Sequence, residues 1–294
     1  MNITQLKYFS AICEFTSVSA AANYLHISQP SLSRVIKELE NEFGVTLFSR
    51  HKNGVALTIE GETLYNLAKD ILSRANHAED IMKDLGDKRK KLRLGVPPMI
   101  GSLILQSIYK DFSIENPDIS LVITEGGRQE LIQKLNEDYI DMMFLLQNKP
   151  LENHFQTIKL ASFEIAYCTT RDNPISSENH VTPDMLSKAP IVLFKDSYFQ
   201  TAEIKKWFEN DNIKPNILMQ TEQLSTMLNL ISNNVASGFM FRSLIENSDG
   251  LVAIPLEKPM YADACLVWKN SSYSFNSMKK FKDYVKTNNP FNYI

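Results

Sequence analysis

The sequence has few of the features that mark disulfide-bonded or metal-binding chains. Only three of its 294 residues are cysteine, Cys13, Cys168 and Cys265, and no two of them have CxxC spacing. Neither a disulfide framework nor a zinc site is therefore expected, and the three residues are predicted to be reduced, buried thiols. A redox-sensing pair of Cys168 and Cys265 is the alternative, provided that the fold brings their strands together.

Long apolar runs are also missing. No stretch approaches the roughly 20 apolar residues of a transmembrane helix, and the N-terminal segment 1–7 is polar where a secretory signal requires an apolar core. Hydrophobic residues make up 44% of the chain and charged residues 22%, as in globular proteins. We therefore expect a cytoplasmic protein without a membrane partner, and its length favours about two domains.

The chain lacks the excess of positive charge that often accompanies nucleic-acid binding. Its formal net charge is −3. Residues 1–58 carry five basic side chains and four acidic ones. Net charge therefore does not indicate DNA binding, and the positions of the charges matter more than their sum.

Three helices are predicted within the first 44 residues. Apolar residues at helical spacing predict the first over 3–15, and the serine- and alanine-rich segment 17–25 predicts the second. Ser28 is a suitable N-cap for the third, and Pro30 fits its first turn because no hydrogen bond is lost there. The third helix ends at Gly44. Its buried stripe is predicted to consist of Leu32, Ile36, Leu39 and Phe43.

The opposite face of the third helix carries side chains that can bond base edges and phosphates in a major groove. These are Gln29, Ser31, Arg34 and Lys37. Segment 45–50 then reads as a strand, Asn53-Gly54 as a hairpin turn, and 55–58 as the returning strand. A helix-turn-helix followed by a hairpin is a winged helix, so residues 1–58 are predicted to form a DNA-binding domain.

The order and spacing of these residues resemble those of LysR-type transcriptional regulators. The similarity runs without a gap from Leu6 to Gly61 and includes AAANYLHISQPSLS over 20–33 and GVTLFSR over 44–50. It implies a DNA-binding regulator that is not an enzyme and has no cofactor, with promoter DNA, further copies of itself and RNA polymerase as partners. With the cap and the basic face included, the predicted DNA-binding residues are Ser28, Gln29, Pro30, Ser31, Ser33, Arg34, Lys37, Arg50 and Lys52.

Residues 59–86 are predicted to form a long linker helix, about 40 Å in length at 1.5 Å per residue. Seven apolar residues follow one another at spacings that alternate between four and three, as in a coiled-coil seam. They are Leu64, Ala68, Ile71, Ala75, Ala78, Met82 and Leu85. We expect this seam to form a homodimer, which could assemble further into a dimer of dimers. The alternative is that it packs on its own winged helix, for which Leu67 and Leu72 lie off the seam.

A charged hinge at 87–91 is read as a solvated boundary rather than a DNA patch. After it strands and helices alternate, among them strands expected over 91–96 and 141–146 and a helix expected over 202–210. This pattern predicts parallel sheets covered by helices, an α/β domain over 92–294. The LysR resemblance implies two lobes similar to periplasmic binding proteins. Lobe I would comprise 92–161 and 267–294, and lobe II 162–266.

Ligands of such sheets bind beyond the carboxyl ends of the strands. Strand ends at 95–102, 124–128 and 197–201, together with the resemblance, predict an effector site formed by Pro98, Met99, Arg128, Gln147, Ser197, Thr201 and Gln223. Arg128 could clasp a carboxylate with two hydrogen bonds. The alternative is a surface arginine paired with Glu125 or Glu130. The turn GVPPMIGS at 95–102 is similar to a branch of the family that responds to short-chain carboxylates and overflow metabolism.

Two other functions were weighed. An enzyme fused to a DNA-binding domain is disfavoured because the sequence contains no nucleotide-binding glycine motif, no GxSxG and no HExxH, and its five histidines are scattered. A solute-binding protein is disfavoured by the polar N-terminus and the winged helix. The sequence therefore predicts a transcription factor that responds to a small effector.

Overall fold

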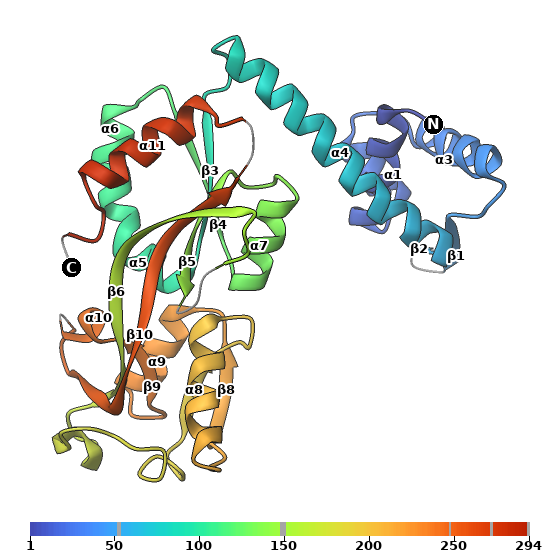
Figure 1. Ribbon diagram of the computed structural model, residues 1–294. Coiled ribbons are helices and arrows are strands. Elements are labelled where there is room, and N and C mark those ends of the chain that lie inside the picture. The colour runs from blue at the N-terminus through green and yellow to red at the C-terminus, as the bar shows by residue number, and fades with distance from the viewer. Residues whose placement is uncertain (52–53, 148–150, 247, 271–272, 293–294) are drawn as a thin grey trace. The chain divides into compact units, whose positions relative to one another are not determined.

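The computed structural model describes residues 1–51, 54–147, 151–246, 248–270 and 273–292. The chain forms two compact units, Met1–Gly86 and Asp87–Ile294. The first is helical with a two-stranded hairpin and the second is α/β (Figure 1). No helix within the described ranges is long and apolar enough to cross a membrane.

The N-terminal unit begins with three helices, each started by a capping side chain. They are α1 (Ile3–Phe15), α2 (Val18–Tyr24) and α3 (Gln29–Phe43), capped by Asn2, Ser17 and Ser28. Gly44 ends α3 in a left-handed conformation with φ 67°, which glycine adopts without steric cost. Strands β1 (Phe48–His51) and β2 (Gly54–Leu57) then pair antiparallel. The winged helix-turn-helix predicted from the sequence is therefore present.

The core of this unit joins all three helices to the wing and to α4 (Ile59–Leu85). Phe9 and Phe48 contact each other with ring centroids 5.3 Å apart, which ties α1 to the wing. On α4, Ala68 is fully buried in this core and Leu72 packs against it. The prediction that Ala68 lies on an intermolecular seam is therefore wrong, because a side chain with no exposed surface cannot contact a second chain.

Leu67, and not Ala68, lies on the exposed side of α4. In the alternative interpretation Leu67 would pack on its own winged helix, but the side chain is 54% exposed. It lies with Leu64 and Ile71 along a shallow apolar groove whose other walls come from the end of α3 and the start of the wing. The exposed apolar stripe of α4 therefore continues through Leu67 to Met82 and Leu85, which are also exposed.

The first turn of α4 rests directly on the backbone of the wing. The Thr58 amide and hydroxyl both donate to the Leu47 carbonyl oxygen, over 3.1 and 3.2 Å. Gly61 follows so closely that a Cβ atom at this position would lie 2.1 Å from the same oxygen. The sequence must therefore provide glycine here, although its φ is unexceptional.

The larger unit is organised by a six-stranded sheet with the order β4-β3-β5-β10-β6-β9. The strands β3 (Lys91–Val96), β4 (Ser120–Glu125) and β5 (Met142–Gln147) are parallel, as predicted. One face is covered by α7 (Arg128–Asn136), whose Leu131 packs with Met143. The other is covered by α5 (Pro98–Ser107), a π-helical turn at Ile108–Phe112, the short α6 (Ser113–Glu115) and α11 (Asn276–Thr287) (Figure 1).

Two long antiparallel strands connect the lobes, and the sequence pattern did not predict their length. β6 (Phe155–Thr170) and β10 (Leu251–Lys269) pair from Phe155 opposite Lys269 to Thr170 opposite Leu251. The sheet is therefore mixed, not parallel throughout. On the side away from β6, β10 pairs with β5 in one lobe. On the side away from β10, β6 pairs with β9 (Gly238–Phe241) in the other lobe.

The same two strands separate the cysteines that the sequence left as a possible redox pair. Cys265 lies opposite Lys159, whereas Cys168 lies opposite Ala253. Nine residues of β6 between Lys159 and Cys168 span about 30 Å at the rise of a strand, whereas a disulfide requires Cα atoms within roughly 7 Å. Burial also raises the pKa of Cys168 to about 12. Pairing of the two thiols within one chain is therefore excluded.

The second lobe contains the parallel pair β7 (Ile191–Phe194) and β8 (Ile217–Thr221), with β9 beside it. The helices of this lobe are α8 (Phe199–Asn210), α9 (Leu224–Ser232) and α10 (Arg242–Glu246). A 3-10 turn at Pro174–Ser177 precedes β7. Phe208 and Phe239 pack edge to face between α8 and β9, with ring centroids 6.4 Å apart.

Arg89 corrects the prediction of a solvated hinge. Its side chain is 1% exposed, and its guanidinium donates to both oxygens of Asp141 over 2.7 and 2.8 Å. It also lies 3.7 Å from the ring centroid of Phe275, and Arg93 donates to Asp141 from the other side. The end of the hinge is thus fixed to the large unit by a buried ion cluster.

Candidate functional site

The exposed polar side chains of α3 gather at its N-terminal end. Ser28 caps the helix by accepting a hydrogen bond from the Ser31 amide over 3.3 Å. Gln29 accepts a hydrogen bond from the Ser19 hydroxyl over 3.0 Å, which connects the turn to α2. The remaining predicted residues of this helix are also exposed: Pro30, Ser31, Ser33, Arg34 and Lys37.

Arg34 is the most accessible cation of this face. Its side chain is 82% exposed and pairs with Glu38, 3.0 Å away on the next turn. Such exposed pairs contribute little stability, so the guanidinium is free to exchange this partner for a phosphate or a base edge. Arg50 lies in β1 of the wing, whereas Lys52 lies outside the described residues.

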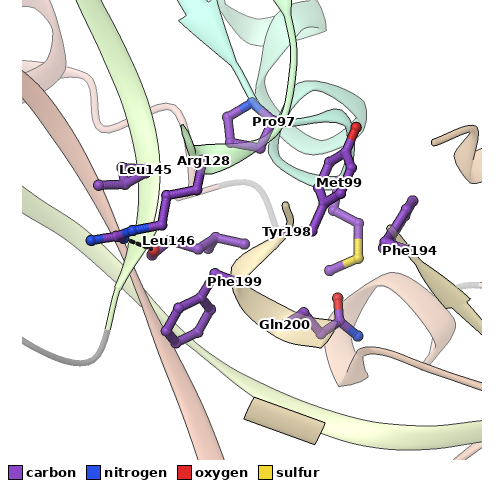
Figure 2. A pocket seen from close by; sticks show the side chains of 9 residues that line it. All are labelled: Pro97, Met99, Arg128, Leu145, Leu146, Phe194, Tyr198, Phe199 and Gln200. Carbon is purple, nitrogen blue, oxygen red and sulfur yellow. Dashed lines mark hydrogen bonds between the residues drawn. The ribbon is translucent and has the colours of Figure 1, made fainter. Parts of the chain in front are cut away.

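A cavity lies in the large unit where elements of both lobes meet (Figure 2). It encloses about 380 Å³ of space, part of which is open to solvent. Its walls are apolar apart from three side chains, Arg128, Tyr198 and Gln200. The remaining lining residues are Pro97, Met99, Leu145, Leu146, Phe194 and Phe199.

A second, more polar cavity of about 660 Å³ adjoins the first, because Arg128, Tyr198 and Phe199 line both. Gln147 and Ser197 line only the second cavity. An apolar wall combined with a few polar groups is typical of the lining of sites for small organic molecules.

Arg128 begins α7 and its side chain is half-buried. Its guanidinium donates to the Leu146 carbonyl over 2.9 Å, which fixes it against the end of β5 (Figure 2). Burial lowers the pKa of this guanidinium. Glu130, one of its two predicted partners, instead bonds Lys134 over 2.7 Å, and no acidic partner of Arg128 is found in the described part of the chain. This geometry favours a cation that is available to an anionic ligand.

The two lobes touch directly beside this arginine. The Arg128 amide donates to the Ser197 carbonyl over 3.1 Å, joining the start of α7 to the loop after β7. A Cβ atom on Gly127 would lie 2.7 Å from the Ser197 hydroxyl. Glycine at 127 therefore permits this approach.

The seven predicted effector residues divide into two groups. Met99, Arg128, Gln147 and Ser197 line one or both cavities, whereas Pro98, Thr201 and Gln223 line neither. Thr201 is buried and donates to the Phe194 carbonyl over 2.9 Å, so its hydroxyl is used inside the lobe. Gln223 is exposed at the start of α9.

Sequence reasoning missed the aromatic wall of the cavity and Gln200. These residues belong to the end of β7 and the first turn of α8, which begins at Phe199 and not, as predicted, at Ala202. A shift of three residues in the helix start rotates the inward-facing positions. The signal that could have found them is the strand end itself, since Phe194 is the last residue of β7.

Comparison with known proteins agrees with both units. The model of the bacterial regulatory helix-turn-helix protein, lysR family, matches residues 3–62. The model of the LysR substrate binding domain matches residues 86–290.

Relatives and solved structures resemble the chain over most or all of its length. The uncharacterized HTH-type transcriptional regulator YybE of Bacillus subtilis is 29% identical over 233 residues, 79% of this chain and 80% of that protein. The HTH-type transcriptional regulator CzcR of Bacillus anthracis is 25% identical over 301 residues, 100% of both. CbnR in complex with its target DNA has a TM-score of 0.71 at 21% identity, covering 98% of this chain and 99% of that one.

The two matched domains together cover nearly the whole chain, in the order that the fold shows. The chain belongs to the LysR family: it is a LysR-type transcriptional regulator with a helix-turn-helix domain and an effector-binding domain.

Proposed function

We propose that this regulator reads DNA with the N-terminal end of α3 and responds to a small carboxylate in the cavity beside Arg128. The DNA part is supported by the exposed polar face of α3, on which Ser31 and Arg34 are both exposed. An exposed helix N-terminus also favours phosphate, because its amide groups and dipole attract anions. CbnR, which has the same fold, is described in complex with its target DNA.

We also propose that a second copy of the chain packs against the exposed apolar stripe of α4. Leu67 and Ile71 are exposed along an apolar groove, and Met82 is 68% exposed further along the helix. Apolar residues at these spacings pair as in a coiled coil. The two DNA-binding domains of such a dimer would bind two half-sites at once. The resulting gain in affinity compensates for the weak positive charge of each domain. Promoter DNA and RNA polymerase in the cytoplasm are the remaining partners of such a regulator.

The carboxylate part is supported by Arg128. It is a half-buried cation that borders both cavities, and none of the described acidic side chains pairs with it. A guanidinium binds a carboxylate through charge-assisted hydrogen bonds, which are stronger than neutral ones. Two carboxylates at the polar cavity, Asp196 and Glu203, are each paired with a lysine, over 2.6 Å to Lys205 and 3.1 Å to Lys206, which offsets part of their repulsion of an anion.

The Arg128→Gln substitution tests the carboxylate site. Full-length protein is titrated with acetate, butyrate and benzoate while tryptophan fluorescence and the unfolding temperature are followed. We expect at least one acid to bind saturably and to lose about tenfold or more in affinity in the variant, because a charge-assisted hydrogen bond is worth about 1.5–3 kcal/mol. Glutamine retains a donor for the Leu146 carbonyl, so the local fold should persist.

Arg171→Gln is the matched control, since Arg171 is exposed outside both cavities. It should leave the affinities unchanged. Equal affinities of the wild type and Arg128→Gln would remove Arg128 from the site, and failure of every acid to bind would contradict the carboxylate proposal as a whole.

A further inference from the structure

Gln200 places an unsatisfied hydrogen-bond acceptor in the apolar cavity. Its side chain amide donates to the Phe239 carbonyl in β9. The oxygen Oε1 is buried, and no hydrogen-bond donor among the described residues reaches it. The residue itself is only 4% exposed. A buried polar atom without a partner costs free energy, so its retention calls for an explanation.

The orientation of this amide is fixed by chemistry. Because the Phe239 carbonyl can only accept, the amide nitrogen must face it, and the oxygen must face the other way. Figure 2 shows the consequence: the Gln200 oxygen lies on the side of Met99, while the nitrogen points away from the other lining residues. In the flipped orientation the Gln200 oxygen would face the Phe239 carbonyl oxygen. Two acceptors would then repel each other, and the amide nitrogen would face the cavity.

The other lining residues cannot satisfy this oxygen. Most of the cavity wall is carbon, from residues such as Met99, Phe194 and Phe199. The Tyr198 hydroxyl points away from Gln200 in Figure 2. The Arg128 guanidinium points away from Gln200 in Figure 2, toward the Leu146 carbonyl. The cavity thus offers a cation, an apolar surface and an acceptor, and lacks a donor for that acceptor.

We propose that the effector is a carboxylic acid that also carries a hydrogen-bond donor, such as a hydroxyl group, which donates to Gln200 Oε1. This inference rests on the proposed carboxylate site and adds the second polar group of the ligand. The carboxylate binds at Arg128, the carbon skeleton lies against the apolar wall, and the donor reaches Gln200. A site that buries an acceptor in this way discriminates against ligands that leave it unpaired.

Matched pairs of acids that differ by one hydroxyl group test the proposal. Full-length protein is titrated with benzoate, 3-hydroxybenzoate and 4-hydroxybenzoate, and with butyrate and 4-hydroxybutyrate. We expect the best hydroxylated acid of at least one skeleton to bind about tenfold or more tightly than its parent acid. In Gln200→Leu this preference should disappear or reverse, because leucine offers no acceptor. Comparing two affinities within one protein cancels any effect of the substitution on folding.

Gln133→Leu is the matched control, since Gln133 is exposed on α7 and bonds only Glu137. It should keep the wild-type preference. If the parent acids bind in an Arg128-dependent manner but hydroxylation gains nothing, or if Gln200→Leu keeps the preference, the inference about Gln200 is wrong and the carboxylate site stands. If no acid binds at all, the carboxylate proposal fails and this inference fails with it.

Discussion

Replacing Asp141 by asparagine is expected to cost the effector-binding unit about 3–5 kcal/mol of its free energy of unfolding. Asp141 is 1% exposed and accepts hydrogen bonds from both Arg89 and Arg93, at distances down to 2.6 Å. Asparagine would remove the buried negative charge that both guanidinium groups face. Removing one partner of a buried ion pair costs far more than the intact pair contributes.

Denaturation with urea, followed by tryptophan fluorescence, measures this loss of stability in the effector-binding unit itself. The only two tryptophans, Trp207 and Trp268, both lie in the effector-binding unit. Asp263→Asn is the control, because Asp263 forms a solvent-exposed pair with Lys159; such pairs contribute about 0–1 kcal/mol. Equal destabilisation by the two substitutions would show that the buried cluster has no special importance.

The pH dependence of this effect follows from the pKa of Asp141. Burial alone would raise it, but hydrogen bonds and charges from Arg93 and Arg89 outweigh burial and lower it. A carboxylate with a lowered pKa stabilises the fold above its unfolded pKa of about 3.9, and the stabilisation is lost as the pH falls through the folded pKa. The difference in free energy of unfolding between the wild type and Asp141→Asn should therefore have its full size at neutral pH and become smaller in acid.

Gly61→Ala is expected to destabilise the winged helix by about 3 kcal/mol or more, the upper range for overpacking. The new Cβ would lie 2.1 Å from the Leu47 carbonyl oxygen and 2.9 Å from Leu57 Cδ2. The first obstacle is backbone, so α4 must move away from the wing. That movement would also break the hydrogen bonds from Thr58 to Leu47.

Two signals separate the units in this experiment. Circular dichroism reports the helices of both units, whereas tryptophan fluorescence reports only the larger one. A part of the circular-dichroism transition should therefore move to lower denaturant while the fluorescence transition stays in place, and this separated part is the helical transition of Met1–Gly86. Gly86→Ala, at the opposite end of α4, has no contact below 3.5 Å and should change stability by no more than about 0.5 kcal/mol. A wild-type helical transition in Gly61→Ala would contradict the packing described here.

The local features of the fold were predictable because they depend on neighbours in sequence. Ser28, Pro30 and Gly44 delimit α3 through capping and backbone conformation, and the structure places them where the sequence indicated. The parallel strands β3 and β5 were equally clear, since β3 begins with alternating basic and apolar residues and β5 is an almost continuous apolar run. Arg128 was identified as a cavity residue from its position after a strand end together with the LysR resemblance.

Features that depend on distant partners were not predictable. Long β6 and β10 pair with each other across the chain, and β10 contains Pro255 and charged residues that obscure its pattern. Ala68 and Leu67 differ by one helical position, and only the packing of α1 and the wing decides which is buried. Likewise, Gln200 enters the cavity because α8 begins earlier than its sequence signals suggested, and Arg89 is buried because Asp141 lies opposite it.

The central claim is that α3 reads DNA, and binding of labelled DNA by an Arg34→Ala variant tests it most directly. A duplex from the chain's own upstream region and a scrambled duplex are titrated at a fixed moderate salt concentration, with fluorescence anisotropy as the readout. Loss of an arginine at a base costs about 1–3 kcal/mol, so we expect at least about fivefold weaker specific binding.

Arg171→Ala removes the same charge from the other unit and should bind both duplexes as the wild type does. The account predicts that the wild type prefers the upstream duplex and that only Arg34→Ala loses this preference. An Arg34→Ala protein that binds the upstream duplex as tightly as the wild type would contradict it.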